Sequence, residues 1–326
     1  MFGGNFMKDV IKNEEIEALE KVIKKVKRPC LKEILSVQQQ ILRSIDEFMI
    51  KENVTRVMPL MMAPITDTLN HDVEETELNY CGQKFDVMKS MIFHKQLILM
   101  NEGLEKIYIV SPNIRLERPE RNDTRHLFEF SQVDFEFKNA KMDDVLSFIE
   151  RLVSYVFNDL KEKCSKEITS MVGSLEHLNI TKPFARYRTE DLCEKYGEDF
   201  ERIASEKATE PFFLINHKRE FYDKEDLNNP GTYLNYDLIW PRGFVEGLSG
   251  GEREFEYDRI LVRMDEIGQS RELFRNYIEV AKRGLLPQTA GAGLGVERIT
   301  RYVLQLGGID DVTIFNRKPG ETPYIF

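Results

Sequence analysis

The residues best suited to chemistry lie in one charged stretch, residues 113–137. It carries Arg115 and Glu117, followed after a polar segment by Arg125 and Asp134. An arginine on a strand offers a planar fork of donors that suits a polyphosphate. Carboxylates two residues apart on a strand share one face, where they suit an ammonium group or a divalent metal ion. Taken alone, the stretch would more often be a solvated hairpin with its charges directed outward.

The elements that position these residues follow from the hydrophobic pattern. Residues 107–110 and 130–137 are apolar or alternating, as in strands, and the charged segment 118–124 between them predicts a loop. The same pattern, at helical spacing, predicts amphipathic helices from residue 31 and over residues 144–163. The polar stretch 65–80 is expected to form a lid over the site.

Composition is ordinary for a soluble enzyme. The chain has 326 residues, 41% hydrophobic and 31% charged, and its apolar runs are shorter than the ~20 residues of a membrane span. The N-terminus does not have the pattern of a secretory signal, and the four scattered cysteines lack metal-ligand spacing. The net charge of −10 argues mildly against a large nucleic-acid surface. We expect a cytoplasmic enzyme with free thiols.

Three motifs resemble those of a known family. R-x-E (residues 115–117) and R-H-L-x-E-F-x-x-x-D-x-E (residues 125–136) resemble the second motif of class II aminoacyl-tRNA synthetases, in the form used by the aspartate and asparagine enzymes. Residues 291–298 match the third motif, G-x-G-x-G-x-E-R, and residues 31–59 match the first, a helix leading to a strand that ends in Pro59. The resemblance implies an α+β fold with an antiparallel sheet flanked by helices. It also implies a homodimer, because that proline lies at the subunit boundary in the family.

The resemblance implies an ATP site. Arg115 would bind the α-phosphate and the reacting carboxylate and, with Arg298, would be catalytic. Phe130 would lie against the adenine and Arg298 would close its other face. Alternate glycines would let the backbone approach the nucleotide, although they could also serve tight strand packing. The full expected ATP set is Arg115, Glu117, Arg125, His126, Phe130, Glu246, Gly293, Gly295 and Arg298. His126 could instead be a packed histidine of the hairpin.

Magnesium would accompany ATP in this family. Residues 236–253 resemble the segment that holds catalytic Mg²⁺, which prefers oxygen ligands beside substrate phosphates. Glu246 and Ser249 are the expected ligands. Asp237 is a third candidate, but it lies two residues further from Glu246 than in the tRNA-charging relatives.

The amino-acid pocket of the aspartate-specific relatives has a counterpart here. Those enzymes use a serine, a lysine five residues later, and an arginine seven residues after the metal-binding glutamate; the matching residues are Ser90, Lys95 and Arg253. Two cations select a carboxylate over an amide, because an amide would leave both charges unpaired. Gln132 and Asp134 are expected to bind the substrate ammonium group.

Ile92 departs from the charging enzymes, which have a glutamine two residues after the serine. The segment looks more like that of an ammonia-dependent asparagine synthetase, a relative that adenylates the side-chain carboxylate of aspartate. We therefore expect an aspartate–ammonia ligase that forms asparagine, AMP and pyrophosphate from aspartate, ATP and ammonia. No membrane and no nucleic acid would take part. The alternatives are a truncated aspartyl- or asparaginyl-tRNA synthetase, or a paralogue, that passes the activated amino acid to tRNA or another acceptor, and a non-catalytic paralogue.

The domain organisation is expected to be simple. We expect a single catalytic domain over residues 1–326, with residues 1–28 as an N-terminal helical extension. The charging relatives carry an oligonucleotide-binding barrel before the first motif, whereas about thirty residues precede it here. The resemblance therefore implies a catalytic core without an anticodon-binding domain.

Overall fold

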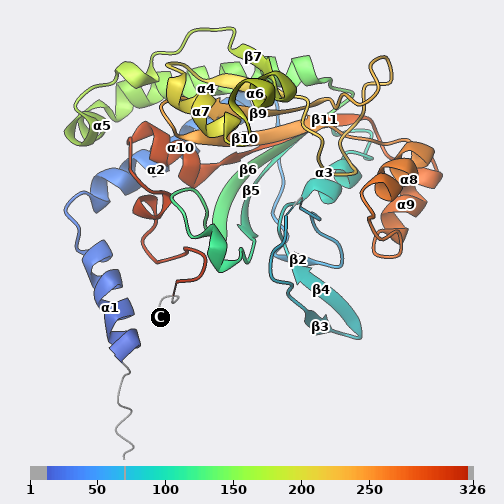
Figure 1. Cartoon of the computed structure of the whole chain (residues 1–326), viewed down its shortest axis with the longest axis horizontal. Coiled ribbons are helices and arrows are strands. Elements are labelled where there is room, and N and C mark those ends of the chain that lie inside the picture. The colour runs from blue at the N-terminus through green and yellow to red at the C-terminus, as the bar shows by residue number, and fades with distance from the viewer. Residues whose placement is uncertain (1–12, 70, 322–326) are drawn as a thin grey trace, which may run out of the picture.

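A large, mostly antiparallel sheet forms the centre of the molecule (Figure 1). The computed structural model describes residues 13–69 and 71–321. The order of the eight strands is β1-β5-β6-β11-β10-β9-β8-β7, and only the pairs β1–β5 and β7–β8 are parallel. Their bounds are β1 Thr55–Arg56, β5 Lys106–Ile114, β6 Glu129–Lys138, β11 Thr289–Gly295, β10 Val245–Glu252, β9 Asn235–Trp240, β8 Phe212–Ile215 and β7 Ala185–Arg188.

Helices and a small second sheet surround this centre. The helices are α1 Asn13–Val26, α2 Leu31–Lys51, α3 Ile92–Ile98, α4 Met142–Lys163, α5 Ser165–Val172, α6 Thr189–Tyr196, α7 Phe200–Lys207, α8 Tyr257–Glu266, α9 Arg275–Lys282 and α10 Val296–Val303. Short 3₁₀ turns lie at Pro119–Arg121, Glu176–Leu178 and Ile309–Val312. The small sheet has the order β2-β4-β3, with β2 Met62–Ala63, β4 Gln83–Val87 and β3 Leu78–Tyr80.

The two faces of the large sheet have different characters because side chains alternate along a strand. On β6, Val133, Phe135 and Phe137 are buried in the main core with residues of α2, α4 and α10. The intervening β6 residues carry polar side chains, which therefore point to the opposite face of the sheet. One face is thus the hydrophobic core, and the other is available for a polar pocket.

The helices α2 and α4 are held by their apolar stripes. Val37, Ile41 and Ile45 of α2 are fully buried, and so are Ile149 and Val156 of α4. Each such side chain contributes roughly 1.5–3 kcal/mol by leaving water. The two longest helices therefore cover the apolar face of the sheet.

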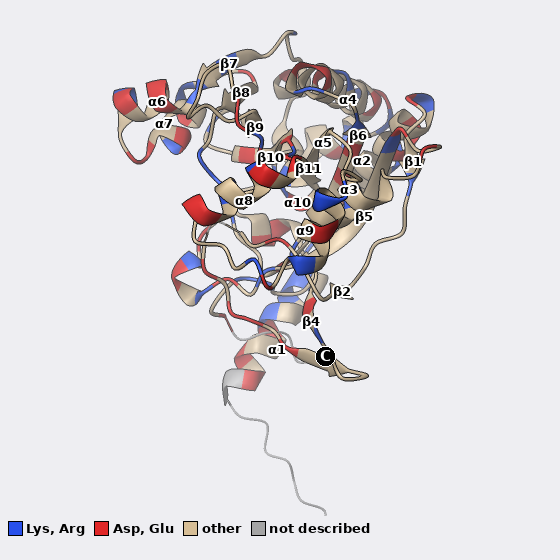
Figure 2. Cartoon of the chain, turned by 90° about the vertical axis from the view of Figure 1, so that its right-hand side faces the viewer, with Lys and Arg blue, Asp and Glu red and all other residues tan. Residues whose placement is uncertain are grey.

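The N-terminal helix α1 projects away from the sheet in both ribbon views, and acidic and basic residues lie along it (Figure 2). Lys25 of α1 is joined to Asp310 by an ion pair of 2.5 Å. α1 covers residues 13–26 of the segment expected to be helical, and residues 1–12 lie outside the described part of the chain.

The expected fold class is confirmed: a large, mainly antiparallel sheet flanked by helices. Within the described residues, the helices lack the combination of length and apolar sequence needed to cross a bilayer.

Candidate active site

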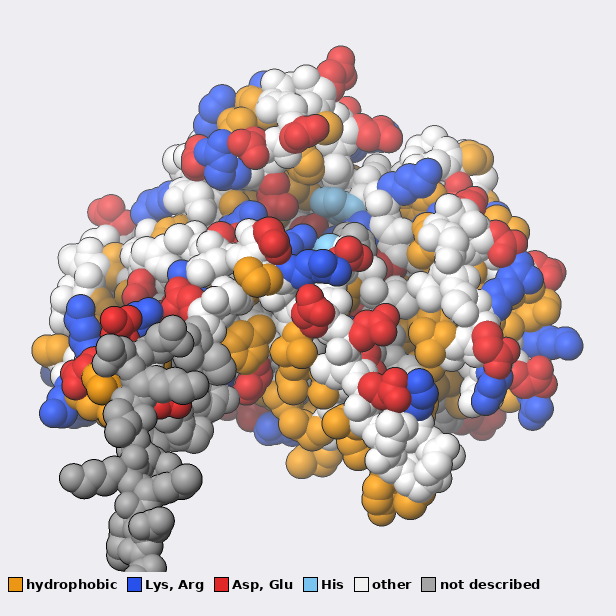
Figure 3. Space-filling model, turned by 60° about the horizontal axis from the view of Figure 1, so that its bottom comes forward, with side chains coloured by type: hydrophobic (Ala, Val, Ile, Leu, Met, Phe, Trp, Pro, Cys, Tyr) orange, Lys and Arg blue, Asp and Glu red, His pale blue; other side chains and the backbone are white. Residues whose placement is uncertain are grey.

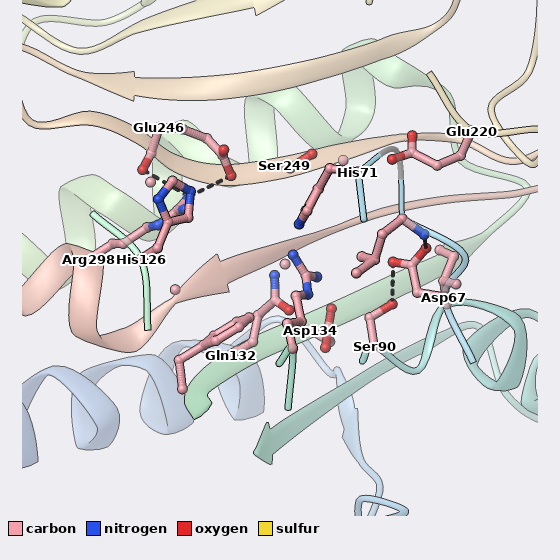
Figure 4. Close-up of a pocket in the computed structure, with 18 of the residues that line it drawn as sticks. Asp67, His71, Ser90, His126, Gln132, Asp134, Glu220, Glu246, Ser249 and Arg298 are labelled. Carbon is pink, nitrogen blue, oxygen red and sulfur yellow. Dashed lines mark hydrogen bonds and ion pairs between the residues drawn. The ribbon is translucent and has the colours of Figure 1, made fainter. Parts of the chain in front are cut away.

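A cavity of about 250 Å³ lies on the polar face of the sheet. Its floor comes from β6, β10 and β11, and its walls come from the β5–β6 loop, the start of α3, the segment between β2 and β3, and the segment before β9. Figure 4 shows His126, Glu246 and Arg298 at one end, and Asp67, Ser90 and Glu220 at the other. Gln132 and Asp134 lie between these two ends.

In the cavity lining, an arginine lies over an aromatic ring. The guanidinium carbon of Arg115 is 5.2 Å from the centre of the Phe130 ring, and its Nε donates to the Lys89 carbonyl at 3.2 Å. The β5–β6 ladder places both residues at the cavity, since Arg115 directly follows β5 and Phe130 lies near the start of β6. A planar cation held in this way is ready for an anionic ligand.

Arg298 enters the cavity from α10 and is held by Glu246. The ion pair has an N–O distance of 2.7 Å, and the arginine also donates to the Glu246 carbonyl at 3.2 Å. Burial alone would lower the pKa of Arg298, but Glu246 and Glu201 outweigh burial and raise the pKa above its ordinary value. Contact of Arg298 with a nucleotide, as expected from the sequence, remains a prediction.

The loop between β5 and β6 is organised by Asp123. Its carboxylate accepts from the backbone N–H groups of Arg125 and His126 and lies 2.8 Å from His126 Nδ1. Burial, followed by the charge of Arg298, lowers the pKa of His126 below its ordinary value. Arg125 lies 3.7 Å from Glu201 of α7. His126 thus has both a structural partner and a place in the cavity wall.

Glu117 is engaged by the segment expected to form a lid. Its Oε1 lies 3.0 Å from Nε2 of His71, which also lines the cavity. Burial raises the pKa of Glu117, but the hydrogen bond and charge of His71 outweigh burial, and the pKa is lowered. Asp67, Leu69 and His71 of the segment expected to form a lid therefore line the cavity, whereas its later part forms β3.

The two cations expected to bind a carboxylate do converge. Lys95 is 2% exposed and lies 3.1 Å from Asp134 and 3.4 Å from Glu136. Arg253 Nε lies 3.1 Å from the same Glu136, and the nearest nitrogen of Arg253 is 3.6 Å from Asp223. Both cations line the cavity and are held by buried carboxylates.

Gln132 and Asp134 line the cavity floor as expected, but each already has partners. Gln132 Oε1 accepts from Asn113 at 2.6 Å, and Asp134 accepts from Ser111 at 3.2 Å as well as from Lys95. Gly293, directly opposite Asp134 in the ladder, makes room for both side chains. A Cβ at this position would meet the amide of Gln132 and, at 2.8 Å, the carboxylate of Asp134.

The expected magnesium ligands divide into two groups. Glu246 lines the cavity and is partly exposed. Asp237 accepts from Arg219 at 2.9 Å and lies 3.1 Å from His217, so its carboxylate already has two partners, and its role as a metal ligand stays a prediction. Ser249 accepts from the same Arg219 at 3.1 Å. Among the described residues, no three of His, Cys, Asp and Glu are grouped so as to hold an ion by themselves.

Sequence reasoning missed several pocket residues: Asp67, His71, Arg121, Arg219, Glu220, Tyr222 and Asp223. Most of them belong to two connecting segments that the fold brings together. The dense run of charge and aromatic residues at 217–223 was the available signal. The side-chain contacts of this run could not be assigned without the fold.

Comparison with known proteins places this fold and pocket in the class II synthetases. The family model described as tRNA synthetases class II (D, K and N) matches residues 13–319. The chain belongs to this family.

Individual relatives agree with this assignment. The asparagine–tRNA ligase of Pyrococcus abyssi is 30% identical over 311 residues, which cover 90% of this chain and 70% of the relative. The aspartate–tRNA(Asp/Asn) ligase of Methanopyrus kandleri is 30% identical over 302 residues, covering 87% and 67%. The crystal structure of asparaginyl-tRNA synthetase from Pyrococcus horikoshii complexed with asparaginyl-adenylate matches with a TM-score of 0.83 at 26% identity, covering 94% of this chain and 73% of that one.

These relatives correct two expectations. The assignment as an ammonia-dependent asparagine synthetase was wrong, because the relatives and solved neighbours are tRNA ligases. The exclusion of nucleic acid as a partner was wrong for the same reason. Ile92, from which the first of these inferences was drawn, is a buried residue of the pocket wall that also packs with Phe93 and its aromatic neighbours.

Proposed function

We propose that this chain is an aminoacyl-tRNA ligase that activates asparagine or aspartate with ATP and transfers the aminoacyl group to tRNA. The observation that carries this proposal is that Arg115, Arg298, Lys95 and Arg253 all line one cavity. The first pair suits the phosphates of ATP, and the second suits a small polar amino acid.

Activation requires the amino-acid carboxylate to attack the α-phosphorus of ATP, with pyrophosphate leaving. Negative charge builds on the phosphorus oxygens in the transition state, and fixed cations in a water-poor site stabilise it. Arg115 is held in place by Phe130 and the Lys89 carbonyl, so little reorganisation is needed when the phosphate arrives. The acceptor hydroxyl of tRNA would then attack the acyl carbon and release AMP.

Magnesium suits the nucleotide end of the cavity. Mg²⁺ takes much of its coordination from phosphates and water and needs one or two protein carboxylates. Glu246 is the partly exposed carboxylate that would supply one, whereas Asp237 is engaged by Arg219 and His217. When bound, the ion would neutralise phosphate charge. Arg298, which pairs with Glu246, would lie beside the ion and the nucleotide.

Aspartate is a second candidate for the amino acid, and a specific observation favours it. Asparagine is named by the P. abyssi relative and by the adenylate complex, but Lys95 and Arg253 place two buried cations at the base of this pocket. A carboxylate would pair with them, whereas an amide would not.

The test is amino-acid-dependent exchange of radiolabelled pyrophosphate into ATP, followed by transfer to total tRNA. Asparagine or aspartate should support exchange at least tenfold above the other, and addition of tRNA should yield an acid-stable aminoacyl ester. Exchange with neither amino acid would contradict the proposal. Arg298→Ala is the matched inactive variant, and Arg202→Ala, an exposed arginine of α7, is its control.

A further inference from the structure

Two carboxyl groups that no motif predicts meet at the amino-acid end of the cavity. Asp67 comes from the segment after β2, and Glu220 comes from the segment between β8 and β9. Figure 4 shows both at the same end of the pocket as Ser90. Both line the cavity, and their side chains are largely buried.

Asp67 is fixed by donors on two sides. Ser90 Oγ donates to one carboxylate oxygen at 2.9 Å, and the Tyr222 hydroxyl donates to the other at 2.9 Å. Tyr222 lies two residues after Glu220, so these bonds tie the Asp67 segment to the Glu220 segment. The relative positions of the two carboxyl groups are therefore set by neutral donors and do not depend on a cation between them.

Glu220 is held less tightly. Its nearest cation is Arg219, whose Nε is 3.6 Å from Glu220 Oε2, which is too long for a hydrogen bond. The same Arg219 also faces Asp223 at 3.7 Å and donates to Asp237 at 2.9 Å. One guanidinium is thus shared among three carboxyl groups. A carboxylate can accept about four hydrogen bonds, so Glu220 keeps acceptor capacity for a ligand.

The groups facing Glu220 leave an excess of negative charge. Asp67 and Asp223 repel the ionised form of Glu220, and Arg219 attracts it. Arg253 is already paired with Asp223 and Glu136, and Arg263 donates to the backbone carbonyl of Glu220. Tyr222 is neutral because burial and Asp67 raise its pKa. Burial raises the pKa of Glu220 to about 8; Arg219 opposes this rise, and Asp223 and Asp67 reinforce it. A bound cation would relieve the repulsion.

The rest of the pocket offers less favourable acceptors for an ammonium group. Ile92 is apolar, Gln132 Oε1 already accepts from Asn113, and Asp134 is paired with the Lys95 cation. At the base of the pocket, Lys95 contacts Asp134 and Glu136, and Arg253 contacts Glu136 and Asp223, so the carboxylates there are already paired with cations. An amino acid placed with its side chain at this base therefore needs its amino group received elsewhere.

We propose that Glu220, together with Asp67, binds the α-ammonium group of the amino-acid substrate. This inference rests on the proposed activation of asparagine or aspartate. Ser90 then acts mainly by orienting Asp67, and Glu220 distinguishes an amino acid from the corresponding acid that lacks the amino group.

The test compares each amino acid with its analogue that lacks the amino group. Calorimetric titration of the full chain with aspartate and succinate, and with asparagine and succinamate, gives the dissociation constant of each ligand. The dissociation constant of the analogue divided by that of the amino acid should fall roughly 10- to 100-fold in Glu220→Gln, the range for losing a hydrogen bond to a charged group. Glu220→Asp, which keeps the charge, should give an intermediate ratio. Glu198→Gln, at an exposed site, should leave the ratio unchanged.

The pH dependence supplies a second readout. The ammonium group prefers the ionised carboxylate, so wild-type affinity for the amino acid should rise between about pH 6 and pH 8. Glu220→Gln should remove this rise, and the analogue should lack it in both proteins. Equal weakening of amino acid and analogue by Glu220→Gln would overturn this inference alone, provided that the wild type still charges tRNA. A wild type that binds neither amino acid would overturn the proposed function as well.

Discussion

Glu136 lies beneath both cations of the amino-acid pocket and is completely buried. It contacts Lys95 and Arg253, and it also accepts from Thr289 at 2.9 Å. A buried carboxylate is tolerated only when it is paired and hydrogen-bonded. The pocket therefore has a rigid charged base, which is what discrimination between a carboxylate and an amide requires.

Lys95→Met tests this base. The substitution leaves Asp134 and Glu136 with a single remaining cation, so the free energy of unfolding should fall by about 3–5 kcal/mol. Pyrophosphate exchange with aspartate should fall more than exchange with asparagine. Denaturant unfolding and exchange assays measure the two effects. Lys84→Met removes an exposed lysine from Glu77 and should change neither. Equal losses with both amino acids would contradict a selective role for Lys95.

Glu297 gives a pH-dependent prediction. Its carboxyl faces the Ser131 N–H with both oxygens at 3.0 Å, and burial raises its pKa to about 7. A raised pKa means that the folded state binds more protons than the unfolded state, so stability falls as pH rises from about 4.5 to 7. Glu297→Gln should reduce this fall by about 2–3 kcal/mol. Urea unfolding of both proteins at pH 5 and pH 8 measures this fall in stability. The same fall in Glu297→Gln as in the wild type would contradict a raised pKa of Glu297.

At the scale of elements, the sequence was informative where a local pattern carries the signal. The alternation along β6 and the length of α4 predicted a strand and a helix, and both are found. The motif residues Arg115, Phe130 and Arg298 reach one cavity because β5, β6 and β11 are neighbours.

Other features could not be predicted from local patterns. Asp67 and Glu220 lie in connecting segments, and only the tertiary fold brings them together. The sequence likewise could not show that Arg219, 18 residues away in the chain, donates to the carboxylate of Asp237.

The β6–β11 pair offers a direct test of how the strands shape the pocket. Gly293→Ala places a methyl group against Gln132 and Asp134. We expect a rise in the KM for the amino acid of about tenfold or more, with stability lowered by about 1–3 kcal/mol. Gly103→Ala is the control. Gly103 lies in an exposed turn, where an added Cβ would be 3.3 Å from the nearest atom, so the KM and the stability should be nearly unchanged. An unchanged KM in Gly293→Ala would show that these side chains do not position the substrate.

At the scale of the whole molecule, an apolar edge predicts self-association. Met58 and Met61, on either side of Pro59, are 78% and 56% exposed, and Leu60 and Met62 are also exposed. Figure 3 shows hydrophobic side chains gathered along the lower edge of the face it presents. Exposed apolar groups of this kind favour an interface, and a two-fold dimer is the commonest outcome.

Sedimentation velocity at micromolar concentration should therefore report a homodimer. Met61→Glu should shift the protein towards monomer, because a charge would be buried at the interface. Leu227→Glu, at another exposed apolar residue, should leave the dimer intact. A wild-type chain that sediments as a monomer would contradict this prediction without affecting the pocket.

The most direct measurement of the central claim is the chemical state of tRNA after incubation with the chain. Total tRNA, Mg-ATP and either asparagine or aspartate are combined, and the terminal adenosine is released by nuclease and weighed by mass spectrometry. We predict an asparaginyl or aspartyl ester on that adenosine, formed with AMP and absent with Arg298→Ala. A folded wild-type protein that forms no ester with either amino acid would contradict this prediction.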